Sequence, residues 1–189
     1  MRSLPLPESV ECLEQARNEA ETHGWEQIRS DCRREVRSAL LKNQGGYCIW
    51  CERGICDDDS HVDHIIPQSQ ESSKRRDIKN LGVSCNTNGT CGRRKGGNID
   101  MALHLFPYED EGIDALFRFL PNGKIEAFGG DAKAAYMIRH YGLNSPKLVN
   151  VRKNTATRIL CLVDLSESNR DVLLAYPDNF PTMHQQLLS

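Results

Sequence analysis

The chain has 189 residues, a formal net charge of -2 and a mean hydropathy of -0.55. This length fits one domain, or one domain with a small elaboration. The charge balance argues against a protein that coats nucleic acid by bulk charge, and no apolar run approaches the ~18 residues of a membrane span. The N-terminus also lacks the apolar core of a signal peptide. We therefore expect a cytoplasmic protein with no membrane partner.

The pattern divides the chain into three segments. Residues 1–46 predict helices, because apolar residues recur at helical spacing from Trp25 to Leu40 and a glycine pair follows. Residues 47–100 hold five of the eight cysteines and two of the six histidines. In this segment the pattern predicts short strands at 61–66 and 81–84, with a polar loop at 68–79 between them.

Residues 101–189 predict a C-terminal α/β segment. Pro121-Asn122-Gly123 lies between two short apolar runs, which is typical of a hairpin. Asp131 is placed to begin a helix, and Ser145-Pro146 is placed to begin another. We find no catalytic pattern in either flanking segment and expect both to serve packing or partner docking.

Two cysteine pairs indicate a metal site. Cys48 and Cys51 have the spacing at which two thiolates on a tight turn face one Zn²⁺. Cys85 and Cys91 supply a wider pair, and Cys56 is a rival fourth ligand. A redox role would need a βαβ pattern nearby, which is absent from the sequence. The remaining cysteines lie on helical patterns and are predicted to be packing residues: Cys12, Cys32 and Cys161.

The sharpest feature is Asp63-His64, which is followed by Pro67. Neighbouring residues of a strand point to opposite faces, so these two side chains share one centre only where the strand ends or bends. A carboxylate there suits a hard divalent cation, and an imidazole suits the activation of water.

Taken in order, these motifs resemble the HNH endonucleases. The residues that carry the resemblance are Cys48, Cys51, Val62 to Pro67, Asn80-Leu81, Cys85, Cys91 and Arg94-Lys95-Gly96. The resemblance implies an α+β fold with a ββα-metal core held by a structural Zn²⁺, and a catalytic Mg²⁺ or another divalent ion. It also implies roles for four residues: His64 as general base, Asp63 as metal ligand, Asn80 as a brace of the loop, and Lys95 as a phosphate contact.

One position departs from the family pattern. The family has Cys-Asn-x-x-Lys-Gly, whereas this chain has Gly92 after Cys91. Glycine cannot ligate a metal through a side chain, so a second ligand must be water or come from elsewhere. The candidates are Asn86, Asn88, Asn98, Asp100 and His61. The departure leaves an alternative open, in which the chain is a weak or inactive zinc-binding module that docks nucleic acid or an ATPase.

A narrower resemblance extends along most of the chain, to the HNH subunit of Septu-type and retron-associated anti-phage systems. It rests on Gln44 to Cys48, His104 to Tyr108 and Leu143 to Val149. It implies an ABC/SMC-like ATPase partner, and a retron reverse transcriptase complex is a further candidate. The other alternative is a stand-alone, restriction-type HNH nuclease.

A basic window lies beside these motifs. Ser73 to Lys95 contains seven basic residues and one acid, which is a net charge of +6 in 23 residues. Clustered Lys and Arg side chains bind phosphates without reading sequence. The predicted nucleic-acid contacts, with DNA favoured over RNA, are Lys74, Arg75, Arg76, Arg93, Arg94 and Lys95.

Overall fold

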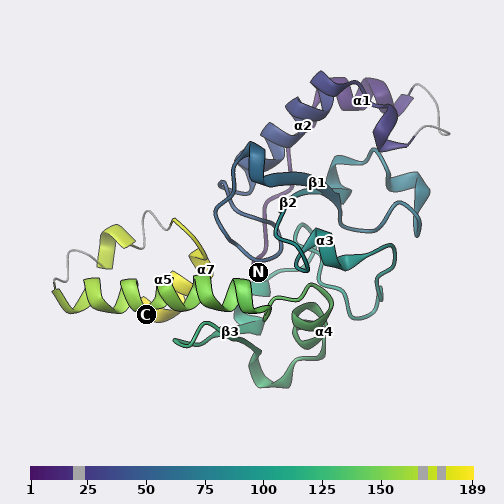
Figure 1. Cartoon of the computed structure of the whole chain (residues 1–189). Helices are drawn as coiled ribbons and strands as arrows, with labels where there is room; N and C mark the ends of the chain where they lie inside the picture. The colour runs from purple at the N-terminus through teal and green to yellow at the C-terminus, as the bar shows by residue number, and fades with distance from the viewer. Residues whose placement is uncertain (19–23, 166–169, 174–177) are drawn as a thin grey trace.

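The computed structural model describes residues 1–18, 24–165, 170–173 and 178–189. Its helices are α1 (Glu11–Asn18), α2 (Ser30–Asn43), α3 (Gly92–Lys95), α4 (Ala132–His140), α5 (Pro146–Leu165) and α7 (Pro181–Leu188). Its strands are β1 (Ser60–His64), β2 (Leu81–Cys85), β3 (Phe117–Phe119) and β4 (Ile125–Ala127). Helices α1 and α2 lie at one end of the molecule and α5 and α7 at the other, with β1, β2 and α3 between them (Figure 1). None of the described helices is long and apolar enough to cross a membrane.

The N-terminal helices pack on the first sheet. The stripe predicted on α2 is confirmed, because Cys32, Val36 and Leu40 are buried in one apolar cluster with residues of β2. A disulfide joins Cys12 on α1 to Cys32 on α2. These two cysteines are therefore bonded to each other rather than merely packed.

Strands β1 and β2 form an antiparallel pair in which Asp63 lies opposite Gly82 and His64 opposite Leu81. The first strand ends at His64, two residues earlier than predicted. The reason is the side-chain amide of Asn80, which accepts a 2.8 Å hydrogen bond from the Ile66 amide and donates one of 3.0 Å to the Ile66 carbonyl. These bonds replace the ladder at Ile66 and turn the chain into the loop.

The predicted C-terminal elements are confirmed. Strands β3 and β4 pair antiparallel around the Pro121-Asn122-Gly123 turn, and the Asp131 carboxylate caps α4 by accepting a 2.8 Å hydrogen bond from the Ala134 amide. A single apolar cluster contains Trp50 from the middle segment and Tyr141 and Phe180 from the C-terminal one. The middle and C-terminal segments predicted from the sequence therefore pack into one common hydrophobic core.

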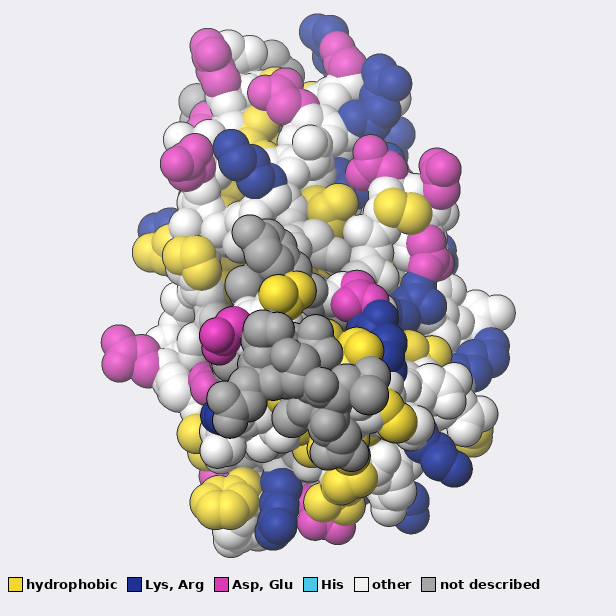
Figure 2. Space-filling model, turned by 90° about the vertical axis from the view of Figure 1, so that its left-hand side faces the viewer, with side chains coloured by type: hydrophobic (Ala, Val, Ile, Leu, Met, Phe, Trp, Pro, Cys, Tyr) yellow, Lys and Arg dark blue, Asp and Glu magenta, His cyan; other side chains and the backbone are white. Residues whose placement is uncertain are grey.

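Charge is mixed over the face of the molecule in Figure 2. Figure 2 shows Lys and Arg side chains interspersed with Asp and Glu over one face, in keeping with the small net charge. Any region that attracts phosphate must therefore be local.

Candidate functional site

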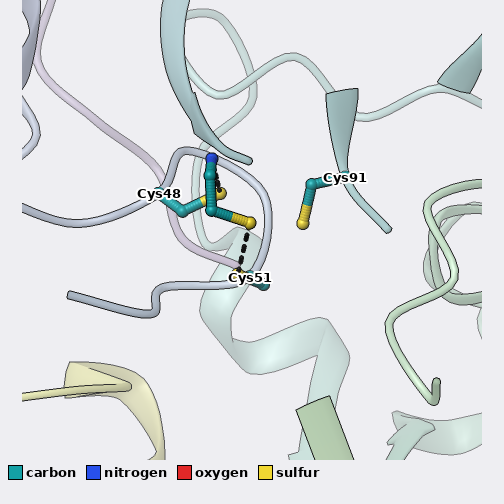
Figure 3. Close-up of side chains that lie close together, drawn as sticks. Cys48, Cys51 and Cys91 are labelled. Atoms are coloured by element: carbon teal, nitrogen blue, oxygen red, sulfur yellow. Dashed lines mark hydrogen bonds between the residues drawn. The ribbon is translucent and has the colours of Figure 1, made fainter. Parts of the chain in front are cut away.

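The four cysteines predicted to bind metal meet in one buried cluster. Their sulfur atoms all lie within 4.8 Å of one another, and they belong to Cys48, Cys51, Cys85 and Cys91. Figure 3 shows Cys48, Cys51 and Cys91 lying close together. The Cys85 amide donates a 3.3 Å hydrogen bond to the Cys48 sulfur. The cluster could hold a metal ion.

Local backbone geometry explains how the cluster forms. The Cys48 amide donates to the Arg53 carbonyl at 2.8 Å, and the Glu52 amide donates to the Cys48 carbonyl at 3.0 Å, which closes a tight turn. Glu52 and Cys91 adopt positive φ angles of 61° and 51°, respectively. Burial raises the pKa of Cys91, because an uncompensated thiolate is costly away from water. A bound cation would compensate that charge.

The two other free cysteines are outside the cluster. Cys56, the rival fourth ligand, is exposed. Cys161 on α5 is also exposed, so the prediction that it packs in the core is wrong.

The Asp63 carboxylate is buried between two donors. The Trp50 indole Nε1 donates a 2.8 Å hydrogen bond to Oδ2, and the Lys95 Nζ donates one of 2.8 Å to Oδ1. Lys95 also donates to the His64 carbonyl, and it is only 6% exposed. The sequence predicts that Lys95 contacts phosphate, but in this arrangement it neutralises Asp63 instead.

His64 is the last residue of β1, and its ring has contacts separate from those of Asp63. Its Nε2–H donates a 2.9 Å hydrogen bond to the Arg75 carbonyl, and its ring meets the Trp25 ring edge-on at 5.8 Å. Because a carbonyl only accepts, this bond leaves the lone pair of a neutral ring on Nδ1. Burial lowers the pKa of His64, which keeps the ring neutral at pH 7.

Asn80 holds the loop that orients His64. In addition to its bonds to Ile66, its side chain donates a 3.2 Å hydrogen bond to the Lys74 carbonyl. Arg75, whose carbonyl accepts from His64, is the next residue. Asn80 can therefore position the His64 ring through one short stretch of backbone.

The predicted basic window does not form a single surface. Arg76 is 8% exposed and donates to the Ala16 carbonyl, and Lys74 pairs with Glu71 at 3.3 Å. Arg93 and Arg94 on α3 are exposed. Of the predicted phosphate contacts, these two are the best placed to meet a large anion.

A basic cleft, which no sequence motif predicted, lies beside α3. It has a volume of about 640 Å³ and is lined by arginines of α2, by His61 of β1 and by Arg93. The α2 arginines are Arg33, Arg34 and Arg37. Arg34 and Arg37 lie off the apolar stripe of α2 and Arg33 lies at its edge. This run of arginines beside the stripe was the sequence signal that could have revealed the cleft.

Comparison with known proteins agrees with the sequence motifs. No family model matches the chain. A protein of Vibrio cholerae serotype O1 biovar El Tor, named "Retron Vc95 putative HNH endonuclease", is 29% identical over 150 residues, which cover 73% of this chain and 71% of the relative. The similarity confirms, over most of the chain, the resemblance to retron-associated HNH endonucleases that the motifs predicted.

Proposed function

We propose that the chain is a metal-dependent HNH endonuclease that hydrolyses phosphodiester bonds in nucleic acid, with DNA as the preferred substrate. The observation that carries the proposal is the end of β1, where a buried carboxylate, Asp63, and a neutral imidazole, His64, are each held by separate hydrogen bonds. The two strands and α3 then constitute a ββα-metal core, with residues 47–100 as its extent.

In this proposal the cysteine cluster holds a structural Zn²⁺. Four thiolates at ~2.3 Å from Zn²⁺ at tetrahedral angles are about 3.8 Å apart, and the Cys51 and Cys85 sulfurs are 4.0 Å apart. That separation is far too long for a disulfide, whose sulfurs are about 2.05 Å apart. The buried, all-sulfur ligand set suits a structural rather than a catalytic ion.

His64 acts as the general base and accepts a proton from the attacking water. Asp63 is the ligand of the catalytic divalent ion, and Asn80 positions His64 through the loop. When bound, the ion supplies electrostatic stabilisation of the scissile phosphate and the leaving oxygen. Since His64 must be neutral to accept a proton, cleavage falls as the pH drops through its lowered pKa.

Phosphate contacts come from the basic cleft. Arg33 pairs with Glu26 at 3.3 Å and Arg37 with Asp57 at 3.6 Å. The exposed side chains of Arg34 and Arg93 therefore supply most of the attraction for a phosphate chain. Arginine contacts with phosphate carry no sequence information, so we expect binding to be largely independent of sequence.

The chain acts as the nuclease effector of an anti-phage complex. The support is the name of the relative, which places that protein with a retron. The proposed partner is an ABC/SMC-like ATPase, and the retron reverse transcriptase is a further one. Residues 1–46 and 101–189 are the segments assigned to docking.

The test is cleavage of supercoiled DNA by the purified chain with Mg²⁺ or Mn²⁺, alone and together with its genomic neighbours. We expect His64→Ala to lower cleavage about 100-fold or more while zinc content stays unchanged. His140→Ala, at a half-buried histidine on α4, is the matched control. If His64→Ala cuts DNA as well as the wild type does, the assignment of His64 as general base is overturned. If the wild type binds DNA and an ATPase but never cuts, the chain is the docking module. Site-selective cutting without any partner would identify a stand-alone nuclease.

A further inference from the structure

The absence of a side chain at position 92 leaves room for two side chains of β1. A Cβ built on Gly92 would lie 2.7 Å from Oδ2 of Asp63 and 2.8 Å from Nε2 of His61. The two ligand-type atoms therefore lie no more than 5.5 Å apart, the sum of these two distances. They share one face of β1, because residues 61 and 63 are two apart on the strand.

Hydrogen bonding fixes which nitrogen of His61 is free to bind a cation. Its Nδ1 lies 2.9 Å from Oδ1 of Asn86, and the same oxygen accepts a 3.0 Å hydrogen bond from the Arg93 guanidinium. A guanidinium only donates, so the Asn86 atom between them is the oxygen and His61 Nδ1 carries the proton. The lone pair of the neutral ring is then on Nε2, which faces Asp63 and Gly92.

This arrangement is the one that metal-binding histidines use. Such a histidine donates its second ring N–H to an oxygen acceptor, which sets the tautomer and the orientation of the ring. Asn86 provides that acceptor here. Lys95 occupies Oδ1 of Asp63, and Oδ2 accepts one hydrogen bond from Trp50 and keeps a second lone pair for a cation beside Gly92.

We propose that Nε2 of His61 and Oδ2 of Asp63 together bind the catalytic divalent cation, with His61 taking the ligand role that position 92 cannot fill. Gly92 is required because any Cβ there would displace the two ligand atoms. The cleft lined by His61 and Arg93 gives phosphate access to the ion. An imidazole ligand favours a transition-series cation over Mg²⁺, which prefers oxygen, and Mn²⁺ serves as the paramagnetic probe of the site. The inference rests on the proposed nuclease function and names a ligand of that same site.

The experiment titrates zinc-loaded protein with Mn²⁺ and follows free Mn²⁺ by electron paramagnetic resonance. We expect one Mn²⁺ per chain, and about 10-fold or more weaker binding in His61→Ala. Gly92→Ala is the second variant, and we expect weaker binding there too because its methyl group enters the space between the ligands. His140→Ala should bind as the wild type does. Circular dichroism and zinc content verify that each variant is folded.

A spectroscopic readout identifies the nitrogen ligand. Electron spin echo modulation of the bound Mn²⁺ should show ¹⁴N coupling in the wild type and in His64→Ala, and should lose it in His61→Ala. Wild-type affinity in His61→Ala, or ¹⁴N coupling that persists there, would overturn the inference. DNA cleavage by the wild type is measured separately. A chain that cuts DNA but does not use His61 as a ligand refutes only this inference. A chain that binds the cation through His61 but does not cut refutes only the proposed nuclease function.

Discussion

The indole Nε1 of Trp50 donates a 2.8 Å hydrogen bond to Oδ2 of Asp63. Trp50 lies between Cys48 and Cys51 in the tight turn of the cysteine cluster, so one side chain joins the predicted zinc site to the predicted catalytic carboxylate. Its ring is fully buried and stacks on Tyr141, with the two centroids 4.3 Å apart. The orientation of Asp63 therefore depends on the turn that carries Cys48 and Cys51 of the cysteine cluster.

Trp50→Phe tests this link. The variant keeps the stacked ring and removes the donor to Asp63, so we expect about 1.5–3 kcal/mol less free energy of unfolding. We expect Mn²⁺ affinity to fall about 10-fold or more, as for other groups that orient a ligand. Urea unfolding and Mn²⁺ titration measure the two effects. Tyr141→Phe is the control, because it loses the 2.7 Å hydrogen bond between its hydroxyl and His104 but leaves the donor to Asp63. Equal cation affinity in both variants would contradict the link.

Zinc should be needed for folding of the middle segment. We expect about one zinc per chain and loss of structure over residues 47–100 on chelation, because metal binding and folding are coupled in small sites. Cys91→Ser should lose zinc and unfold under conditions in which the wild type is folded. Cys56→Ser, at the exposed cysteine outside the cluster, should keep its zinc and stay folded. Elemental analysis and hydrogen exchange provide the measurements, and zinc-free protein with native exchange protection would refute the expectation.

The basic cleft should control DNA affinity through charge. Arg34→Glu with Arg93→Glu should weaken DNA binding, and should reduce the slope of log affinity against log salt by about 1 for each phosphate that the protein no longer neutralises. Fluorescence anisotropy between low and moderate salt measures both quantities. Arg118→Glu together with Arg139→Glu is the charge-matched control, since both arginines are exposed and lie outside the residues that line the cleft. An equal drop in affinity for the control would show that only net charge matters.

Stability should decline in mild acid because of His104. This side chain is fully buried, and burial lowers its pKa to about 3. In the unfolded chain the pKa of His104 is ~6.5. Between pH ~6.5 and the folded-state pKa of about 3, the unfolded chain therefore binds more protons than the folded chain. The free energy of unfolding decreases as the pH falls through this range. The contribution of His104 is complete above pH ~6.5 and is lost progressively below it.

The comparison is urea unfolding at pH 7.5 and 5.5 for the wild type and His104→Gln. The wild type should lose about 1 kcal/mol more than the variant across this range, because glutamine does not titrate. Any zinc release at acid pH should affect the wild type and His104→Gln equally, so it cancels when their losses of unfolding free energy are compared. Parallel pH profiles would show that His104 does not titrate in this way.

Periodicity and short motifs were enough to predict much of this protein. Local spacing predicted four features, because each depends on residues close in the chain. They are the α2 stripe, the two strands of the first sheet, the hairpin around Asn122 and the cap at Asp131. The four clustered cysteines were also identified from spacing and composition alone. The resemblance to HNH endonucleases rested on motifs of the same kind.

Tertiary structure decided what each polar residue contacts. Lys95 and Arg76 belong to a basic window in the sequence, yet both are buried against oxygen acceptors. The α2 arginines line a cleft only because β1 and α3 lie beside that helix. Cys12 and Cys32 are bonded to each other because α1 packs along α2.

The same reason explains why the proposed second cation ligand could not be chosen from the sequence. His61 was one candidate of five, and nothing in its spacing distinguishes it from the four others. Only the fold brings Gly92 of α3 against the face of β1 that carries His61 and Asp63. Side chains far apart in sequence become neighbours through packing, and packing is what a one-dimensional pattern leaves undetermined.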